Sequence, residues 1–372
     1  MRGVHADVIV IGGGLHGCSS AFHLARKNAE VILLESDYCG RHASGVNAGG
    51  VRTLGRPLAE IPLALASREL WHELPDLVGD DVGFLADGQL KVAESDEDIA
   101  ILTERTALLR QHGWTHEVLV DHDTVRALVP SITPNVRGGI WVERDGYAIP
   151  YRAVTAFRRA AQQLGVHVHE NSPAVSIKRV GDSWQVTTPR ETYYATNVIN
   201  ASGAWAGQLA RLMGEQVPVV PTGLMLMITE RIQPFIRPVL GATARSLSFK
   251  QFSNGTVLIG GALRCESVDV DAKHADLDIR RLANSARIVT ELFPFLQGVS
   301  MNRAWSGIEA FTPDELPVIG PSSVAPGLFH AFGFSGSGFQ LGPIVGQLMA
   351  ELILDGQPTL SLEKFAVNRF RN

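Results

Sequence analysis

Short apolar runs alternate with glycine-rich turns and helical segments along the first part of the chain. Strands are predicted over residues 7–11 and 31–34, which are almost entirely apolar. Residues 18–27, between them, have the spacing of a helix. A strand, a helix and a second strand in this order predict a βαβ unit, in which the two strands lie parallel.

The pattern changes from helical to alternating further along the chain. Helices are predicted over most of 58–112, interrupted by a short strand near 88–92, and over 151–164. Strands are predicted at 166–169, 174–178, 184–188 and 192–196, the last three antiparallel, followed by a buried strand from 198 that runs into a glycine turn. The remaining elements are strands at 223–229, 246–252, 256–261 and 328–334, a hairpin turn at Asn254-Gly255, and helices at 275–293 and 339–354.

The turn after the first predicted strand has the spacing Gly-x-Gly-x-x-Gly, formed by Gly12, Gly14 and Gly17. Such glycines permit a tight turn, let the backbone approach a pyrophosphate and let the helix pack closely on the strand. The second strand ends in Glu35, where a βαβ unit places an acid against ribose hydroxyls. An acid disfavours a 2′-phosphate, so FAD or NAD is predicted rather than NADP. The alternative is a glycine turn of purely structural use.

Segments of nucleotide-binding character recur at 1–50, 165–210 and 320–354, so they must fold together. The predicted fold is α/β: a Rossmann-like FAD-binding domain interrupted by a substrate domain with a mixed or antiparallel sheet. We assign residues 1–85, 149–218 and 307–372 to the first domain, and 86–148 and 219–306 to the second. Two domains suit a chain of 372 residues.

Composition indicates an ordinary globular protein, with 45% apolar and 19% charged residues. The formal charge of -5 gives no reason to expect nucleic acid or an anionic membrane as a partner. No apolar run approaches the roughly 20 residues that a membrane span needs. Cys18, Cys39 and Cys265 form no disulfide framework and no metal-site spacing. We therefore expect a cytoplasmic protein without a metal site, a nucleic-acid partner or a membrane span.

Further motifs give the chain a specific resemblance. They are residues 44–50, 198–205, the Thr-Pro-Asp segment at 312–320 and the glycine-rich segment at 333–343. With them the chain resembles the FAD-dependent D-amino-acid oxidase superfamily, which includes glycine oxidase and sarcosine oxidase, over almost its whole length. Residues 305–314 and 338–343 carry a narrower resemblance to β subunits of heteromeric amine dehydrogenases: heterotetrameric sarcosine oxidase, opine oxidases and D-hydroxyproline dehydrogenase.

The resemblance implies an FAD site built from several distant segments. In it Val175 contacts the adenosine part through its backbone, and the helix that begins near Gly338 directs its positive end at the negative charge of a reduced flavin. His16 is expected to act through its backbone. The implied cofactor-binding residues are Gly12, Gly14, Leu15, His16, Gly17, Glu35, Ser36, His42, Ser44, Asn47, Ala48, Gly49, Gly50, Val175, Ala201, Gly203, Trp205, Gly307, Gly336, Ser337, Gly338, Phe339 and Gln340.

Departures from the family pattern refine these expectations. Relatives with covalent flavin carry a cysteine where this chain has residues 306–308, so the FAD is expected to be non-covalent. No histidine occurs at 146–152, where heterotetrameric sarcosine oxidase attaches FMN. This argues against a covalent FMN and leaves open an FMN at a subunit interface. Glycine-oxidase-like members place a substrate-binding arginine where this chain has Glu309, which favours a substrate with a second positive group.

The implied reaction is hydride transfer from an amine-bearing carbon to flavin N5, followed by hydrolysis of the imine. Because the flavin supplies the chemistry, no dedicated base is required and none is named. The substrate carboxylate needs an anchor, ideally an arginine fork. Arg52 is the first candidate, Arg264 the second and Lys250 the third. Tyr147, as a hydrogen-bond donor, and Glu309 complete the catalytic candidates, and a surface or packing role is the alternative for each.

These inferences predict oxidation of a secondary-amine amino acid: an opine, D-hydroxyproline or a sarcosine-like compound. The chain would be the catalytic β subunit of a heteromeric dehydrogenase, whose partner subunits carry flavin or iron–sulfur centres. Three cysteines are too few for such a cluster here. The alternatives are a stand-alone oxidase that uses oxygen and a non-catalytic, flavin-bearing assembly subunit. A nicotinamide enzyme has no use for the C-terminal glycine loop.

Overall fold

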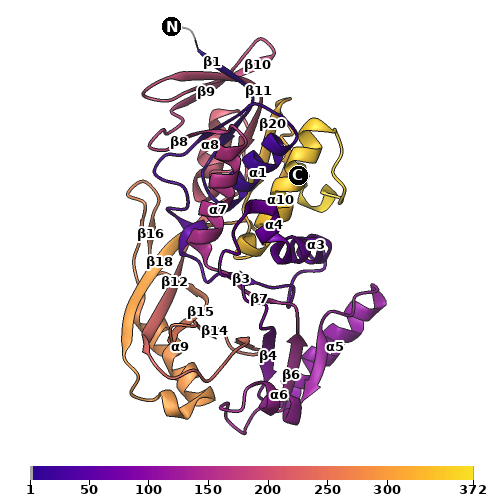
Figure 1. Ribbon diagram of the computed structural model, residues 1–372, viewed down its shortest axis with the longest axis vertical. Coiled ribbons are helices and arrows are strands. Elements are labelled where there is room, and N and C mark those ends of the chain that lie inside the picture. Colours follow the sequence, from indigo (N-terminus) through magenta and orange to yellow (C-terminus); the bar gives the residue numbers. More distant parts are fainter. Residues whose placement is uncertain (1–2, 372) are drawn as a thin grey trace.

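The computed structural model describes residues 3–371, which form two eight-stranded sheets. In Figure 1 the first sheet and its helices occupy the upper half, and the second sheet, with α5, α6 and α9, occupies the lower half. The chain passes from the first sheet to the second and back twice. This confirms the predicted α/β architecture of an interrupted nucleotide-binding unit, while the exact domain boundaries stay a prediction.

The first sheet has the strand order β19-β20-β11-β1-β2-β8. The pairs from β20 to β8 are parallel, and β19 joins antiparallel at the edge. Residues 8–11 of β1 and all of β2 are buried, as expected for parallel strands covered on both faces. The strands are β1 Val4–Ile11, β2 Val31–Leu34, β8 His167–His169, β9 Ser176–Val180, β10 Ser183–Thr187, β11 Thr192–Asn200, β19 Val318–Pro321 and β20 Leu328–Phe332.

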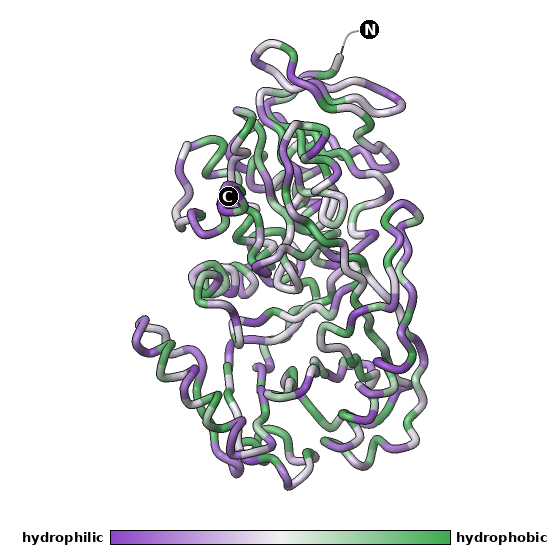
Figure 2. The backbone as a smooth tube through the Cα atoms, turned by 180° about the vertical axis from the view of Figure 1, so that it is seen from behind, coloured by the Kyte–Doolittle hydropathy of each residue, from purple (hydrophilic) through white to green (hydrophobic). Residues whose placement is uncertain are grey.

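Helices cover this sheet and form the largest apolar cluster of the molecule. The hydropathy colours of Figure 2 show hydrophobic segments concentrated inside this half. Helix α1 follows β1 and packs on α10, where a Cβ at Gly342 would overlap the Leu15 side chain. The helices are α1 Leu15–Arg26, α2 Ala43–Val46, α3 Ile61–His72, α4 Leu74–Val78, α7 Pro150–Gln163, α8 Ala206–Leu212 and α10 Gly338–Leu354, with short 3-10 turns at Gly203–Trp205, Glu363–Phe365 and Val367–Phe370.

The second sheet has the order β18-β12-β15-β14-β13-β4-β6-β5. Its strands pair antiparallel except for the parallel pair β13–β4, so the sheet is mixed, as predicted. Its strands are β4 Gln89–Ala93, β5 Val118–Asp121, β6 Gly138–Val142, β12 Val220–Arg231, β13 Val239–Ala242, β14 Ser248–Gln251, β15 Thr256–Arg264 and β18 Met301–Phe311. Its helices are α5 Asp96–Gln111, α6 His122–Leu128 and α9 Ile279–Leu292, with a 3-10 turn at Pro294–Leu296.

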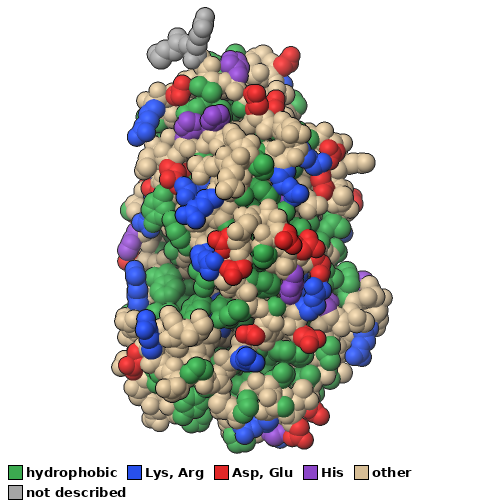
Figure 3. Space-filling model, viewed as in Figure 1, with side chains coloured by type: hydrophobic (Ala, Val, Ile, Leu, Met, Phe, Trp, Pro, Cys, Tyr) green, Lys and Arg blue, Asp and Glu red, His purple; other side chains and the backbone are tan. Residues whose placement is uncertain are grey.

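Two small ribbons complete the fold. The pair of β3 Gly50–Val51 with β7 Gly146–Tyr147 lies between the two halves, and β16 Val268–Asp269 pairs with β17 His274–Ala275. No helix described between residues 3 and 371 is both long and apolar enough to cross a bilayer. On the face shown in Figure 3, acidic and basic side chains are mixed rather than grouped by sign.

Several predicted elements differ from the observed ones. The segments 192–196 and 198–200 form one strand, β11, which pairs antiparallel with β10 and parallel with β1. Helix α9 begins at Ile279, later than predicted, because residues 274–275 pair with β16 and Asp278 caps the helix. Strands β5, β6, β13, β18 and β19 were not predicted, nor were the two-residue strands β3, β7, β16 and β17. Charged residues within β18, Arg303 and Glu309, conceal its apolar positions.

Candidate functional site

A cavity of about 950 Å³ lies where the two halves of the molecule meet. Its walls include the turn after β1, the stretch from residue 40 to 55, residues 201–205 and the segment before α10. The second sheet contributes residues of β4, β12, β13, β15 and β18. Because segments from both sheets meet here, the fold itself assembles the site.

The glycine turn after β1 forms one end of the cavity. Gly12 has a φ of +113°, and a Cβ there would overlap the Ala201 carbonyl group of β11's end. A Cβ at Gly17 would overlap the Gly12 carbonyl oxygen, so α1 packs directly on the turn. The N-cap residue Gly14 offers no side-chain hydrogen bond, and the backbone N–H of Leu15 donates to Ser44 Oγ at 3.0 Å. The start of α1 therefore presents backbone donors to an anion.

Glu35 lies at the end of β2 on the same wall, with 9% of its surface exposed. Its Oε2 accepts a hydrogen bond from the Gly13 N–H at 2.6 Å, and its Oε1 accepts from the Asp37 N–H at 2.8 Å. These bonds hold the carboxylate beside the glycine turn. Spare lone pairs on its oxygens can accept hydrogen bonds from ribose hydroxyls.

The start of α10 forms a second helix terminus at the cavity. Its N-cap residue, Ser337, makes no side-chain cap, while Gly336, Gly338 and Phe339 line the wall. His16 stacks on Phe334 with ring centroids 3.6 Å apart. Burial lowers the pKa of His16 to about 3, so the ring is neutral at physiological pH. Its Nε2 has no hydrogen-bond partner among residues 3–371.

These features fit FAD. Two helix N-termini without side-chain caps face one cavity, and an acid stands beside the first of them. The volume lies near the upper end of ligand cavities, as a dinucleotide and a substrate together require. Of the predicted cofactor-binding residues, the wall contains Gly12, Gly14, His16, Glu35, Ser36, His42, Ser44, Asn47, Ala48, Gly49, Gly50, Ala201, Gly203, Trp205, Gly307, Gly336, Gly338 and Phe339.

Other predicted cofactor-binding residues do not line the cavity. Val175 is exposed and its N–H donates to the Thr187 carbonyl at 2.9 Å, while Pro173 and Ala174 line the wall instead. The Gln340 amide donates to the Ala64 carbonyl at 2.7 Å. The Val175 N–H and the Gln340 side-chain amide thus bind other segments of the chain. The same holds for Ser337, which faces Glu60, and for Leu15 and Gly17, which pack in the core between α1 and its neighbours.

Other side chains around the cofactor turns bind one another. His42 Nε2 lies 3.2 Å from Asp37 Oδ2, and its ring lies against Trp205 at 4.6 Å. The Asn47 amide donates to the carbonyls of Ala43 and Ser44 and accepts from the Gly49 N–H at 2.7 Å. These bonds fix the shape of the stretch that was predicted to flank the flavin.

Arg52 and Glu309 line the part of the cavity between the sheets. Arg52 Nη1 donates to the Leu54 carbonyl at 2.9 Å, and its guanidinium enters no ion pair within residues 3–371. Burial lowers the pKa of Arg52, yet a guanidinium stays protonated. Burial raises the pKa of Glu309 to about 7, opposed by the Gly336 backbone, and Glu309 also has no ion-pair partner in the described chain. Arg52 and Glu309 thus line the cavity without ion-pair partners among residues 3–371.

The remaining catalytic candidates are placed differently. Arg264 lies at the exposed end of β15, its guanidinium 5.2 Å from the Phe311 ring, and it lines the cavity. Lys250 and Tyr147 are not among the residues that line the cavity, so their contacts with substrate stay a prediction. Lys250 Nζ donates to the Ala48 carbonyl, and the Tyr147 hydroxyl donates to the Gln251 carbonyl at 3.3 Å. The first contact ties β14 to the 48–50 stretch, and the second ties β14 to β7.

Two polar residues of β4, Gln89 and Lys91, also line the cavity and were missed from the sequence. They alternate with the buried Leu90 and Val92. This alternation marks one polar and one apolar face of a strand. It was a usable signal, but the sequence does not show that the polar face looks into a cavity.

Comparisons with known proteins agree with this geometry. A family model described as FAD dependent oxidoreductase matches residues 7–352. The chain is 27% identical to hydrogen cyanide synthase subunit HcnC of Pseudomonas protegens, over 98% of this chain and 96% of that protein. It is 27% identical to mitochondrial sarcosine dehydrogenase of Homo sapiens, over 99% of this chain and 42% of that protein. The structure of L-proline dehydrogenase from P. horikoshii matches with a TM-score of 0.92 and 25% identity, over 99% of this chain and 98% of that one.

Proposed function

Because this chain belongs to the family of FAD-dependent oxidoreductases, we propose that it oxidises an amino acid whose amine is secondary. The single observation that carries the proposal is the unpaired Arg52 and Glu309 on the cavity that the cofactor cradle opens into. An arginine suits a carboxylate, and an acid suits an amine. Sarcosine and proline, named for two similar dehydrogenases, are both secondary amines. An opine, D-hydroxyproline or a sarcosine-like compound fits this description.

Arg52 and Glu309 bind different groups of such a substrate. The Arg52 fork binds the carboxylate, and the Leu54 carbonyl fixes the direction of that fork. The Glu309 carboxylate meets the substrate ammonium and takes its proton on a carboxylate oxygen, which leaves the amine neutral. The substrate amine thus supplies the positive charge that Glu309 meets, and a second positive group is not needed. Bound FAD supplies hydride acceptance from the carbon beside the amine.

The proposal includes the role of β subunit in a heteromeric dehydrogenase with a non-covalent FAD. HcnC, similar over nearly its whole length, is named as a subunit. None of Cys18, Cys39 and Cys265 lines the cavity, which supports a non-covalent cofactor and an acceptor centre outside this chain. Partner subunits would carry further flavin or iron–sulfur centres, with an FMN at an interface as one form.

The test is an anaerobic titration of the FAD-loaded chain with opines, hydroxyprolines and N-methyl amino acids. We expect one class to bleach the oxidised flavin band, which identifies the substrate class and this chain as the catalytic subunit. Admission of air then separates two acceptors: fast reoxidation indicates a stand-alone oxidase, and slow reoxidation indicates a dehydrogenase with a partner. A band that no amine bleaches would favour the flavin-bearing assembly subunit and count against the proposal.

Glu309→Gln tests the proton acceptor. Below pH 7 the wild-type Glu309 is protonated and neutral, and above pH 7 it is a carboxylate, because burial sets its pKa at about 7. The rate of flavin reduction at low substrate should therefore rise with pH through this value. The amide variant should lose that step and react roughly 100-fold more slowly at pH 8. Stopped-flow reduction across pH 5.5–9 measures both, and an unchanged pH step in the variant would contradict the assignment.

A further inference from the structure

Gln89 and Lys91 of β4 form a polar group on the cavity wall, separate from the predicted cofactor-binding residues. Both side chains lie on the same face of the strand and line the cavity, as does Arg52. Gln89 is only 8% exposed, and its amide oxygen has no hydrogen-bond partner in the described chain. Lys91 is half-buried and enters no ion pair within residues 3–371. Buried polar groups are normally satisfied, so this pair points to a ligand.

The acids near Lys91 and Arg52 are committed to other groups. Asp98 accepts a hydrogen bond from the Glu94 N–H at 2.9 Å. Both oxygens of Glu117 bind the Arg105 guanidinium at 2.6 Å. Asp145 accepts from the backbone N–H groups of Thr53 and Leu54 at 2.7 and 2.9 Å. Lys91 and Arg52 therefore both line the cavity, and neither pairs with a carboxylate among residues 3–371. Burial, and then repulsion from Arg52 and Arg105, lowers the pKa of Lys91.

Another cation on this wall is already neutralised. Arg245 lines the cavity, but Glu94 binds it through two bonds of 2.5 and 2.8 Å, and Glu291 pairs with it as well. The charge available to a ligand on the β4 side thus comes from Arg52 and Lys91. Arg52 and Lys91 on the β4 side, with Glu309 elsewhere on the wall, match a ligand with two negative charges and one amine.

We propose that Lys91 binds a second carboxylate of the substrate, while Arg52 binds the first. The inference rests on the proposed function and narrows it to secondary amines with two carboxylates, the N-(carboxyalkyl) amino acids. Lys91 supplies the charge, and the unpartnered Gln89 Oε1 accepts a hydrogen bond from an N–H group of the same substrate. The site thereby rejects monocarboxylic amines, because they leave Lys91 unpaired in a half-buried place.

The experiment compares matched amines on the FAD-loaded chain under anaerobic conditions. Iminodiacetate and N-(carboxymethyl)alanine carry two carboxylates; sarcosine and N-methylalanine carry one. We expect the dicarboxylates to bind the wild type more tightly by about 10- to 100-fold. Lys91→Met should erase this preference by weakening the dicarboxylates alone, and Lys91→Arg should restore most of it. Lys178→Met, on exposed β9, is the matched control and should change neither class.

Each outcome decides the inference. Equal affinity of the wild type for both classes, or an equal loss for both in Lys91→Met, would overturn it while leaving amine oxidation intact. If no amine bleaches the flavin, the proposed function fails, and glutarate against butyrate still tests the subsite through shifts of the flavin spectrum. Tighter binding of glutarate that Lys91→Met removes would support the subsite, and identical binding of the two acids would overturn it.

Discussion

Gly17→Ala is expected to abolish tight binding of FAD. The added methyl would overlap the Gly12 carbonyl oxygen, a backbone atom that no side-chain movement can relieve. Helix α1 must then move away from β1, and its N-terminal donors leave the position that the glycine turn gives them. Loss of two hydrogen bonds to a charged pyrophosphate corresponds to about 100-fold or more in affinity. The measurement is the dissociation constant of FAD by quenching of flavin fluorescence.

Gly207→Ala provides the control for Gly17→Ala. Gly207 lies in α8, outside the cavity, where an added methyl would meet its nearest neighbour, Val219, at 3.3 Å. Alanine is favoured over glycine inside a helix, so this variant should fold and bind FAD as the wild type does. Circular dichroism of both variants separates loss of the cofactor from loss of the fold. Normal FAD affinity in a folded Gly17→Ala protein would refute the close-packing argument.

The sequence was sufficient for the cofactor half of the site because backbone requirements are visible in it. Gly12 and Gly17 are positions where only glycine fits, and Glu35 stands at a fixed place after the second strand. Backbone contacts outside these glycine positions were harder to predict from the sequence. Val175 was expected to contact the adenosine part through its backbone, yet its N–H donates to the Thr187 carbonyl and its neighbour Ala174 lines the cavity.

The substrate half could be predicted only in part. Arg52 and Glu309 lie close to recognisable motifs, and both line the cavity. Lys91 could not be placed, because β4 reaches this wall through parallel pairing with β13, a strand far away in the sequence. The surroundings of Lys250 were hidden for a related reason: β14 turns it toward the Ala48 carbonyl. Side chains whose surroundings come from distant strands carry no local signal of what they face.

Arg52→Met is expected to raise KM for every carboxylated amine by 100-fold or more and to change kcat much less. The substitution keeps an apolar stem of similar length and removes the fork that binds the carboxylate. Losing a buried, charge-assisted contact costs about 2–5 kcal/mol. The carboxylate is remote from the carbon that reacts, so ground state and transition state lose binding equally, and the effect appears in KM. Steady-state kinetics with an artificial electron acceptor measure the split.

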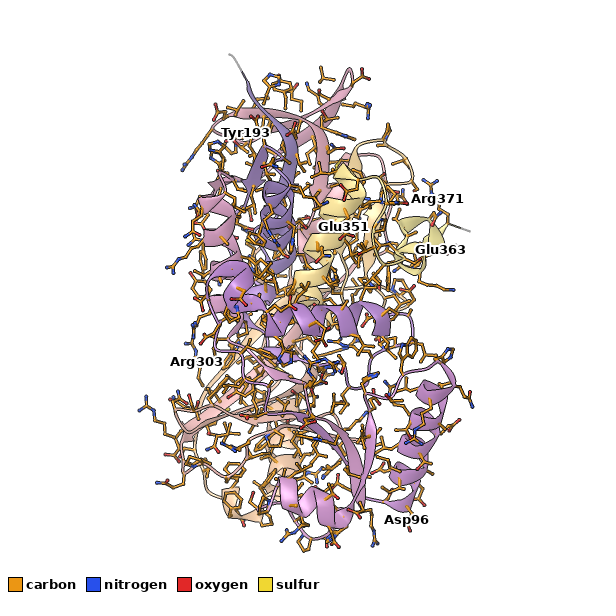
Figure 4. The ribbon with its side chains drawn as sticks, turned by 45° about the vertical axis from the view of Figure 1, so that its right-hand side comes forward. Asp96, Tyr193, Arg303, Glu351, Glu363 and Arg371 are labelled. Carbon is orange, nitrogen blue, oxygen red and sulfur yellow. The ribbon has the colours of Figure 1, made fainter. Side chains whose placement is uncertain are left out.

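Three further variants serve as comparisons for Arg52→Met. Arg303→Met is the matched control, since Arg303 lies at the outer edge of the second sheet, exposed and away from the cavity, as Figure 4 shows. Arg52→Lys should recover part of the affinity, because a lysine restores the charge without the two-point fork. Lys91→Met should weaken dicarboxylates alone, whereas Arg52→Met should weaken both classes. An unchanged KM in Arg52→Met would refute the proposed role of Arg52 in binding the carboxylate. Arg264, at the exposed end of β15, would then be the candidate for that role.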